Sequence, residues 1–182
     1  FYPRQADSSP VPTPGGCVPL PILLLSAALA ADGPQTTITV DPLTTALGYV
    51  HLQVERVVGD SGQLSVYAGP HARLFDGVLT ETPEPFLGAG AEVGIRWFPK
   101  AEAPEGLWVM GRTVGAHLWT TDERELSEFG GYASVLVGST WVLGEVFVLS
   151  GGLGFNYLYY DIDGMGASGP FPAAHSNLGV AF

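Results

Sequence analysis

Along most of the chain, hydrophobic and polar residues alternate in short segments that are separated by turn-forming residues. In segment 48–58, for example, Val50 and Leu52 fall on one face, and His51 and Gln53 fall on the other. Successive side chains of a strand point to opposite sides, so this alternation predicts strands with two unlike faces. It predicts about eight strands, over residues 36–43, 48–58, 63–74, 86–98, 107–119, 130–142, 145–160 and 175–182.

One face of these segments is apolar, whereas the other carries glycine, serine and isolated charges. In segment 86–98, Leu87 and Val93 oppose Gly88 and Glu92. Segment 107–119 is less regular because Arg112 shares a face with apolar side chains, so its register stays open.

The connections between the segments alternate in length. Tight turns at Gly59–Gly62 and Leu143-Gly144 and a modest one at Pro99–Gly106 alternate with longer acidic segments, namely Asp76–Pro85, Thr120–Phe129 and Asp161–Ala174. Short turns on the periplasmic side and long loops on the outside are typical of outer-membrane barrels. With both chain ends on the periplasmic side, the first external connection, near residues 44–47, is very short. Pro70 lacks an N–H donor, which predicts a bulge or a place at the strand's outer rim.

Composition decides which face meets the surroundings. Hydrophobic residues make up 46% of the chain and charged residues only 14%. A water-facing exterior needs denser charge, so we place the apolar face in lipid and predict an all-β, antiparallel up-and-down transmembrane β-barrel; a soluble secreted barrel is the weaker alternative. The net charge of −11, with seven scattered basic residues, excludes nucleic-acid binding.

The charged residues of the polar face then lie inside a narrow barrel, where unpaired charge is costly. We therefore predict a plug of paired charges that fills the lumen, made of Glu55, Arg73, Glu92, Arg96 and Arg112. Aromatic residues near strand ends predict girdles at the membrane interfaces: Trp97, Phe98, Trp108, Trp119, Trp141, Tyr159 and Tyr160.

Residues 1–30 are predicted to be a leader with a signal peptide, and residues 31–182 the barrel domain. The apolar run Val18–Ala30 ends in Ala28-Leu29-Ala30, which has the small residues that signal peptidase requires. The alternative is a buried apolar strand or helix. Cys17, the single cysteine, says little about the compartment.

The chain ends Leu178-Gly179-Val180-Ala181-Phe182. A terminal phenylalanine on an amphipathic strand resembles the assembly signal of bacterial outer-membrane proteins. Together with the alternation and turn spacing, residues 36–182 are similar to the small OmpA/OmpX-like barrels and to uncharacterised outer-membrane barrel families of that size. The resemblance implies a location in the bacterial outer membrane, contact with its lipid, and recognition of Leu178, Val180 and Phe182 by the barrel-assembly machinery.

One motif raises the question of catalysis. His175-Ser176-Asn177 superficially resembles the His-x-Ser-Asn element of lipid A deacylases, in which serine is the nucleophile and histidine its base. Here the histidine and the serine are adjacent and point to opposite faces of a strand. We predict no catalytic residue and no enzyme; a lipid A or phospholipid acyl hydrolase is the alternative function, and a narrow pore is another.

Histidines and glutamates in the predicted strands are candidates for a metal site or an acid–base pair. His51, His71 and His117 are possible ligands inside the lumen, but no short ligand spacing supports a metal site. Glu55 and Glu92 form an acid pair only if an open cleft is present. We expect no cofactor and no metal.

The predicted function is a structural or surface-interaction role, with specificity carried by the external loops. Their acidic residues are suited to a divalent cation or an extracellular partner. Asp161-Ile162-Asp163-Gly164 faintly resembles a calcium loop but lacks the remaining ligands.

Overall fold

The computed structural model describes residues 33–74, 86–100, 102–123 and 125–182. The predicted leader, residues 1–30, lies outside the described residues, as does the whole of the predicted loop Asp76–Pro85.

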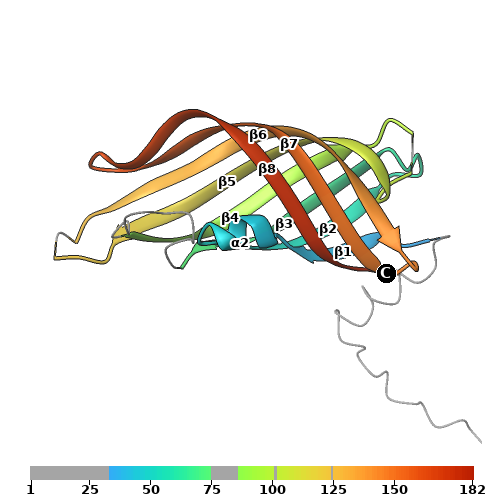
Figure 1. Cartoon of the computed structure of the whole chain (residues 1–182), viewed down its shortest axis with the longest axis horizontal. Helices are drawn as coiled ribbons and strands as arrows, with labels where there is room; N and C mark the ends of the chain where they lie inside the picture. Colours follow the sequence, from blue (N-terminus) through green and yellow to red (C-terminus); the bar gives the residue numbers. More distant parts are fainter. Residues whose placement is uncertain (1–32, 75–85, 101, 124) are drawn as a thin grey trace, which may run out of the picture.

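The chain forms a closed antiparallel barrel in which each strand pairs with the next and β1 pairs with β8 (Figure 1). The strands are β1 Thr36–Val40, β2 Tyr49–Val58, β3 Leu64–Arg73, β4 Phe86–Trp97, β5 Gly106–Thr120, β6 Ser127–Leu143, β7 Phe147–Ile162 and β8 Met165–Ala181, with a short helix, α2, at Pro42–Ala46. The predicted all-β up-and-down barrel is confirmed. Within the described ranges, no helix has both the length and the apolar character needed to cross a membrane.

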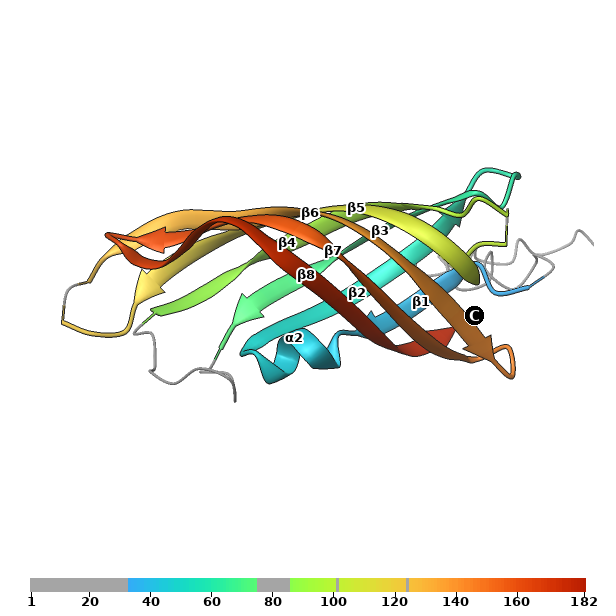
Figure 2. The same cartoon turned by 45° about the horizontal axis from the view of Figure 1, so that its top comes forward.

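The connections are divided between the two ends of the barrel, but not strictly by length, because the two-residue turn at Asp163-Gly164 lies at the end that was predicted to carry the long loops. Residues 59–63, 98–105 and 144–146 join strands at the end where the C-terminus lies, on the right in Figure 1, and the remaining connections lie at the opposite end (Figure 2). The first of these contains α2, where the sequence suggested only a short loop.

The final strand is longer than predicted. The segment Asp161–Ala174 is not a loop: β7 and β8 pair up to Ile162 and Met165 around a turn at Asp163 and Gly164, whose φ angles are 52° and 81°. Positive φ at both central residues gives the turn that best matches strand twist, and Asp-Gly favours it. Glycine and proline within residues 166–172 masked the alternation. The first strand, by contrast, ends at Val40 instead of residue 43.

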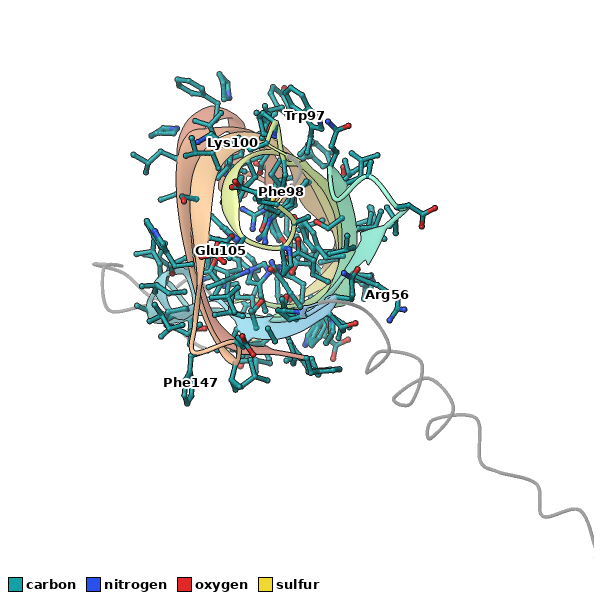
Figure 3. All side chains as sticks on the ribbon, turned by 90° about the vertical axis from the view of Figure 1, so that its right-hand side faces the viewer. Arg56, Trp97, Phe98, Lys100, Glu105 and Phe147 are labelled. Carbon is teal, nitrogen blue, oxygen red and sulfur yellow. The ribbon has the colours of Figure 1, made fainter. Side chains whose placement is uncertain are left out.

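The two faces of the wall are as the alternation indicates. Large apolar side chains such as Val135, Leu153 and Phe155 are 64%, 69% and 73% exposed on the outside. Charged side chains such as Glu55, Glu92 and Arg96 are buried inside, whereas Arg56 is exposed on the outside of β2. Figure 3 views the barrel end-on, with Trp97 and Phe147 projecting outward.

The predicted aromatic girdle is partly wrong. Trp97, Trp119, Trp141 and Tyr159 are exposed on the outside, but Phe98, Trp108 and Tyr160 are buried. Phe98 lies within the ring of strands in Figure 3.

The face of β5 that points into the barrel explains why apolar and polar residues do not alternate regularly along this strand. Arg112 is buried on the same face as Trp108, Met110 and Val114. The Trp108 indole donates to the Thr140 hydroxyl over 2.9 Å. On β5, apolar side chains therefore lie on the face that points into the lumen as well as on the face that points outward.

Pro70 lies within β3 without a bulge. The β2–β3 ladder pairs His51 with His71 and Val54 with Ala68, and the register is the same on both sides of the break at Gly69 and Pro70. The missing N–H is accommodated by the break in the ladder, so the predicted bulge is wrong.

Candidate functional site

The lumen holds two layers of buried charge. In the first, Arg96 Nη1 lies 2.5 Å from Glu55 Oε2, and the Ser65 hydroxyl donates to the same carboxylate. The Arg96 guanidinium also lies over the Trp108 ring, 4.9 Å from its centroid. This layer joins β2, β3, β4 and β5 across the interior.

The second layer centres on Glu92. Its Oε2 lies 3.1 Å from His51 Nδ1 and 4.0 Å from Arg112 Nη1. His51 in turn contacts His71 over 3.0 Å, and His71 Nε2 lies 2.7 Å from the Tyr160 hydroxyl. The chain of contacts crosses the barrel from β4 to β7.

Arg73 completes the set of predicted lumen residues. It donates to the Tyr49 hydroxyl over 3.1 Å and lies over the Phe86 ring, 4.1 Å from the centroid. All five predicted residues are thus buried, with at most 5% exposure. The structure brings Glu55 to Arg96 and Glu92 to Arg112, and it places Arg73 among aromatic rings.

A further buried acid, Asp41, was not singled out in the sequence. It is the N-cap of α2, and its Oδ1 accepts from the Thr44 N–H over 3.1 Å. Its Oδ2 lies 3.2 Å from His175 Nδ1, while Arg96 Nη2 lies 2.9 Å from the other ring nitrogen. The Asp41-Pro42 pair, a capping residue before a proline, is the sequence signal that marks this helix start.

The His175-Ser176 pair lies at the same junction. The Ser176 hydroxyl donates to Asp41 Oδ1 over 2.9 Å and accepts from the Leu43 N–H over 3.0 Å. Among the described residues, no hydrogen bond joins Ser176 to His175. The hydroxyl is therefore oriented toward a carboxylate, and not toward the imidazole that an acyl hydrolase uses as base.

The three histidines considered as possible metal ligands do not lie together. His51 and His71 are in contact, but His117 is exposed on the outer face and stacks on Trp119. In the part of the chain that the structure describes, no group of three or more His, Cys, Asp or Glu side chains is arranged to hold a metal. Glu55 and Glu92 each have basic partners of their own. The Asp161 side chain accepts from the Gly164 N–H and thus closes the β7–β8 turn.

A cavity of about 390 Å³ lies toward the end of the barrel opposite the C-terminus. Aromatic and aliphatic side chains form much of its wall, including Tyr49, Phe86, Tyr132, Leu158, Tyr160 and Phe171. Arg73, Arg112 and His51 also line it. The cavity therefore combines an apolar wall with positively charged groups.

The last strand closes the barrel. Leu178 and Val180 pair with Val40 and Ile38, and both side chains face outward, 48% and 40% exposed. Phe182 exchanges backbone hydrogen bonds with Thr36. The predicted assembly residues thus lie at the closing β1–β8 junction.

Comparisons with protein-family models, curated proteins and solved structures found no match to this chain.

Proposed function

We propose that this protein is an integral β-barrel of the bacterial outer membrane with a structural or surface-interaction role and a plugged, non-conducting lumen. One observation carries the proposal: large apolar side chains cover most of the outside of the barrel, while five charged side chains of its strands, Glu55, Arg73, Glu92, Arg96 and Arg112, are buried within; Arg56 on β2 is a charged residue that is exposed on the outside. Each strand pairs with its neighbours around the barrel, so the backbone groups are largely paired internally, as a hydrocarbon environment requires, except along one edge of β8. Outer-membrane lipid and the barrel-assembly machinery are its proposed partners.

The paired charges support a plug instead of a channel. Glu55, Arg96, Glu92 and Arg112 occupy the interior with little exposure to solvent. An eight-stranded barrel has an interior just wide enough for side chains to fill. The exposed carboxylates of the β5–β6 region, such as Glu123 and Glu128, are available to an extracellular partner or to divalent cations.

The proposal is tested by refolding the chain into detergent micelles and comparing boiled and unboiled samples on gels. We expect a compact, faster-migrating unboiled band that shifts on boiling, and no step conductance in planar bilayers. A chain that stays soluble without detergent and shows no shift would overturn the membrane assignment. Discrete conductance steps would overturn the plug and favour the narrow pore.

We propose no catalytic role for Ser176, because its hydroxyl is bonded to Asp41 and to the Leu43 N–H. Incubation of the refolded protein with labelled lipopolysaccharide or phospholipid tests this directly. Release of a fatty acid by the native chain, lost in Ser176→Ala, would establish the acyl hydrolase instead.

A further inference from the structure

The barrel wall is incomplete beside β8. This strand pairs with β7 from Met165 to Val180, but its pairing with β1 is confined to Leu178–Ala181. In the described part of the chain, no strand pairs with the other edge of residues 165–177. The helix α2 packs near this edge in place of a strand (Figure 2).

Pro42 explains where the β1–β8 ladder stops. Thr36 and Phe182 exchange both backbone hydrogen bonds, and in an antiparallel ladder such pairs recur at every second residue. Continuing past Val40 and Leu178, the next bonded pair would join residue 42 to Ser176. Proline has no N–H to donate. The Ser176 N–H donates instead to the Asp41 carboxylate over 3.4 Å, and the chain turns into α2.

The same alternation directs the N–H groups of even-numbered residues of β8 toward the open edge. Pro170 and Pro172 occupy two of these positions, so the edge lacks donors there. An unsatisfied backbone donor is costly in hydrocarbon, and the prolines remove that cost. Their β7 partners include Phe155, which is 73% exposed on the outside. The open edge therefore lies at the height of the apolar band.

The cavity reaches this gap. Its lining includes inward-facing residues of β8, such as Ala173, as well as the outward-facing residues Pro172 and Ala174. On the opposite side it is lined by Thr44 and Leu47, within and just after α2. Because the cavity is lined by residues from both faces of β8, it extends around the open edge of β8 to the outside of the barrel.

The chemistry of the lining favours an anionic head group. Among the described residues that line the cavity, Arg73 and Arg112 are basic and none is a carboxylate; Glu92, behind the lining, lies 4.0 Å from Arg112 Nη1. Arg112 is 5% exposed, and its Nε has no hydrogen-bond partner among the described residues. The volume of about 390 Å³ lies within the range of small-molecule sites, which typically combine apolar walls with a few polar groups.

We propose that the gap between α2 and β8 is a lateral portal through which a fatty-acid-class amphiphile enters the cavity from the membrane. This inference rests on the proposed membrane location. The carboxylate binds at Arg112, and the acyl chain runs along the aromatic wall and out past Pro172 into lipid. The portal gives the barrel a binding activity in addition to its structural role.

The test uses the full chain refolded in non-ionic micelles, with 11-(dansylamino)undecanoate as the probe and energy transfer from tryptophan as the signal. We expect saturable binding that is about tenfold weaker for the probe's methyl ester and in Arg112→Met, because charge-assisted hydrogen bonds are lost. Equal binding of the acid and the ester would overturn the anionic site. Competition by a zwitterionic lysophospholipid as effective as by a fatty acid would do the same.

A second pair of variants tests the portal without touching the arginines. Ala174→Trp places a bulky ring at the gap, and Ala89→Trp places the same ring on the outside of β4, away from the cavity lining. We expect the first to slow or abolish probe binding and the second to leave it unchanged. Equal binding by both would overturn the portal.

The heat-dependent gel shift separates the two proposals. A variant that retains the shift but does not bind the probe has a folded barrel, so its loss of binding reports on the site. The gel band of the native chain can shift on heating while the probe only partitions into detergent, without saturation and in proportion to the detergent concentration. That result would overturn the portal but leave the membrane barrel supported. If native chain shows no shift, both proposals fail.

Discussion

The Arg96 guanidinium lies 2.5 Å from the Glu55 carboxylate, although β3 separates the strands that carry them. Both side chains are almost fully buried, at 1% and 3% exposure. Removal of either partner leaves a buried charge uncompensated. We expect Glu55→Gln and Arg96→Met each to lower the free energy of unfolding by about 3 kcal/mol, measured by urea titration of the refolded barrel.

The double variant tests whether the two residues act as a pair. Because the second substitution removes the charge that the first leaves orphaned, the double variant should lose less stability than the two single variants together. Strictly additive losses would mean that Arg96 is stabilised mainly by its other contacts, such as that with His175.

Glu92 should be equally sensitive, for the same reason. Its carboxylate contacts His51 and Arg112 in the second buried layer. We expect Glu92→Ala to destabilise the barrel by about 3 kcal/mol. Glu128→Ala, at an exposed position on β6, is the control and should change stability by less than about 0.5 kcal/mol. An unchanged urea midpoint for Glu92→Ala would contradict the prediction that paired charges fill and stabilise the lumen.

Two neighbouring glycines of β7 test how tightly the lumen is packed around Trp108. A Cβ built on Gly152 would lie 2.4 Å from the indole ring and 2.9 Å from the Val137 carbonyl oxygen. At Gly151 the nearest atom would lie 3.8 Å away. We expect Gly152→Ala to cost about 1–3 kcal/mol through overpacking, whereas Gly151→Ala stays near the native value. Urea titration followed by tryptophan emission measures both, and equal stability of the two variants would contradict the packing.

Sequence reasoning recovered the features that depend on alternation. The two faces of segments such as β2 and β4 follow from side-chain period alone, so the burial of Glu55, Glu92 and Arg96 could be predicted. The long β8 was missed because its glycines and prolines break the alternation even though the backbone remains extended. Asp163-Gly164, a strong hairpin signal, was the available clue.

The junction of β1, α2 and β8 could not be predicted from local pattern. Asp41 and His175 are far apart in the chain and meet only when the barrel closes. The meaning of Pro42 likewise depends on which residue of β8 faces it, a matter of register and not of composition. Trp108 was misplaced because strand-end position suggested the membrane interface, whereas its parity on β5 places it with Arg112 in the lumen.

Phe182 has two separable roles, and the last prediction distinguishes them. Its backbone bonds to Thr36 help to close the barrel, while its side chain is the proposed recognition element for the assembly machinery. Phe182→Ser keeps the backbone bonds and removes the ring. We expect it to refold in detergent like the native chain but to yield less folded barrel in outer membranes, measured by the heat-dependent gel shift of membrane fractions. Deletion of Phe182, which also removes the backbone bonds, should impair both. If Phe182→Ser accumulates in outer membranes as well as the native chain does, the ring has no part in assembly and only its backbone matters.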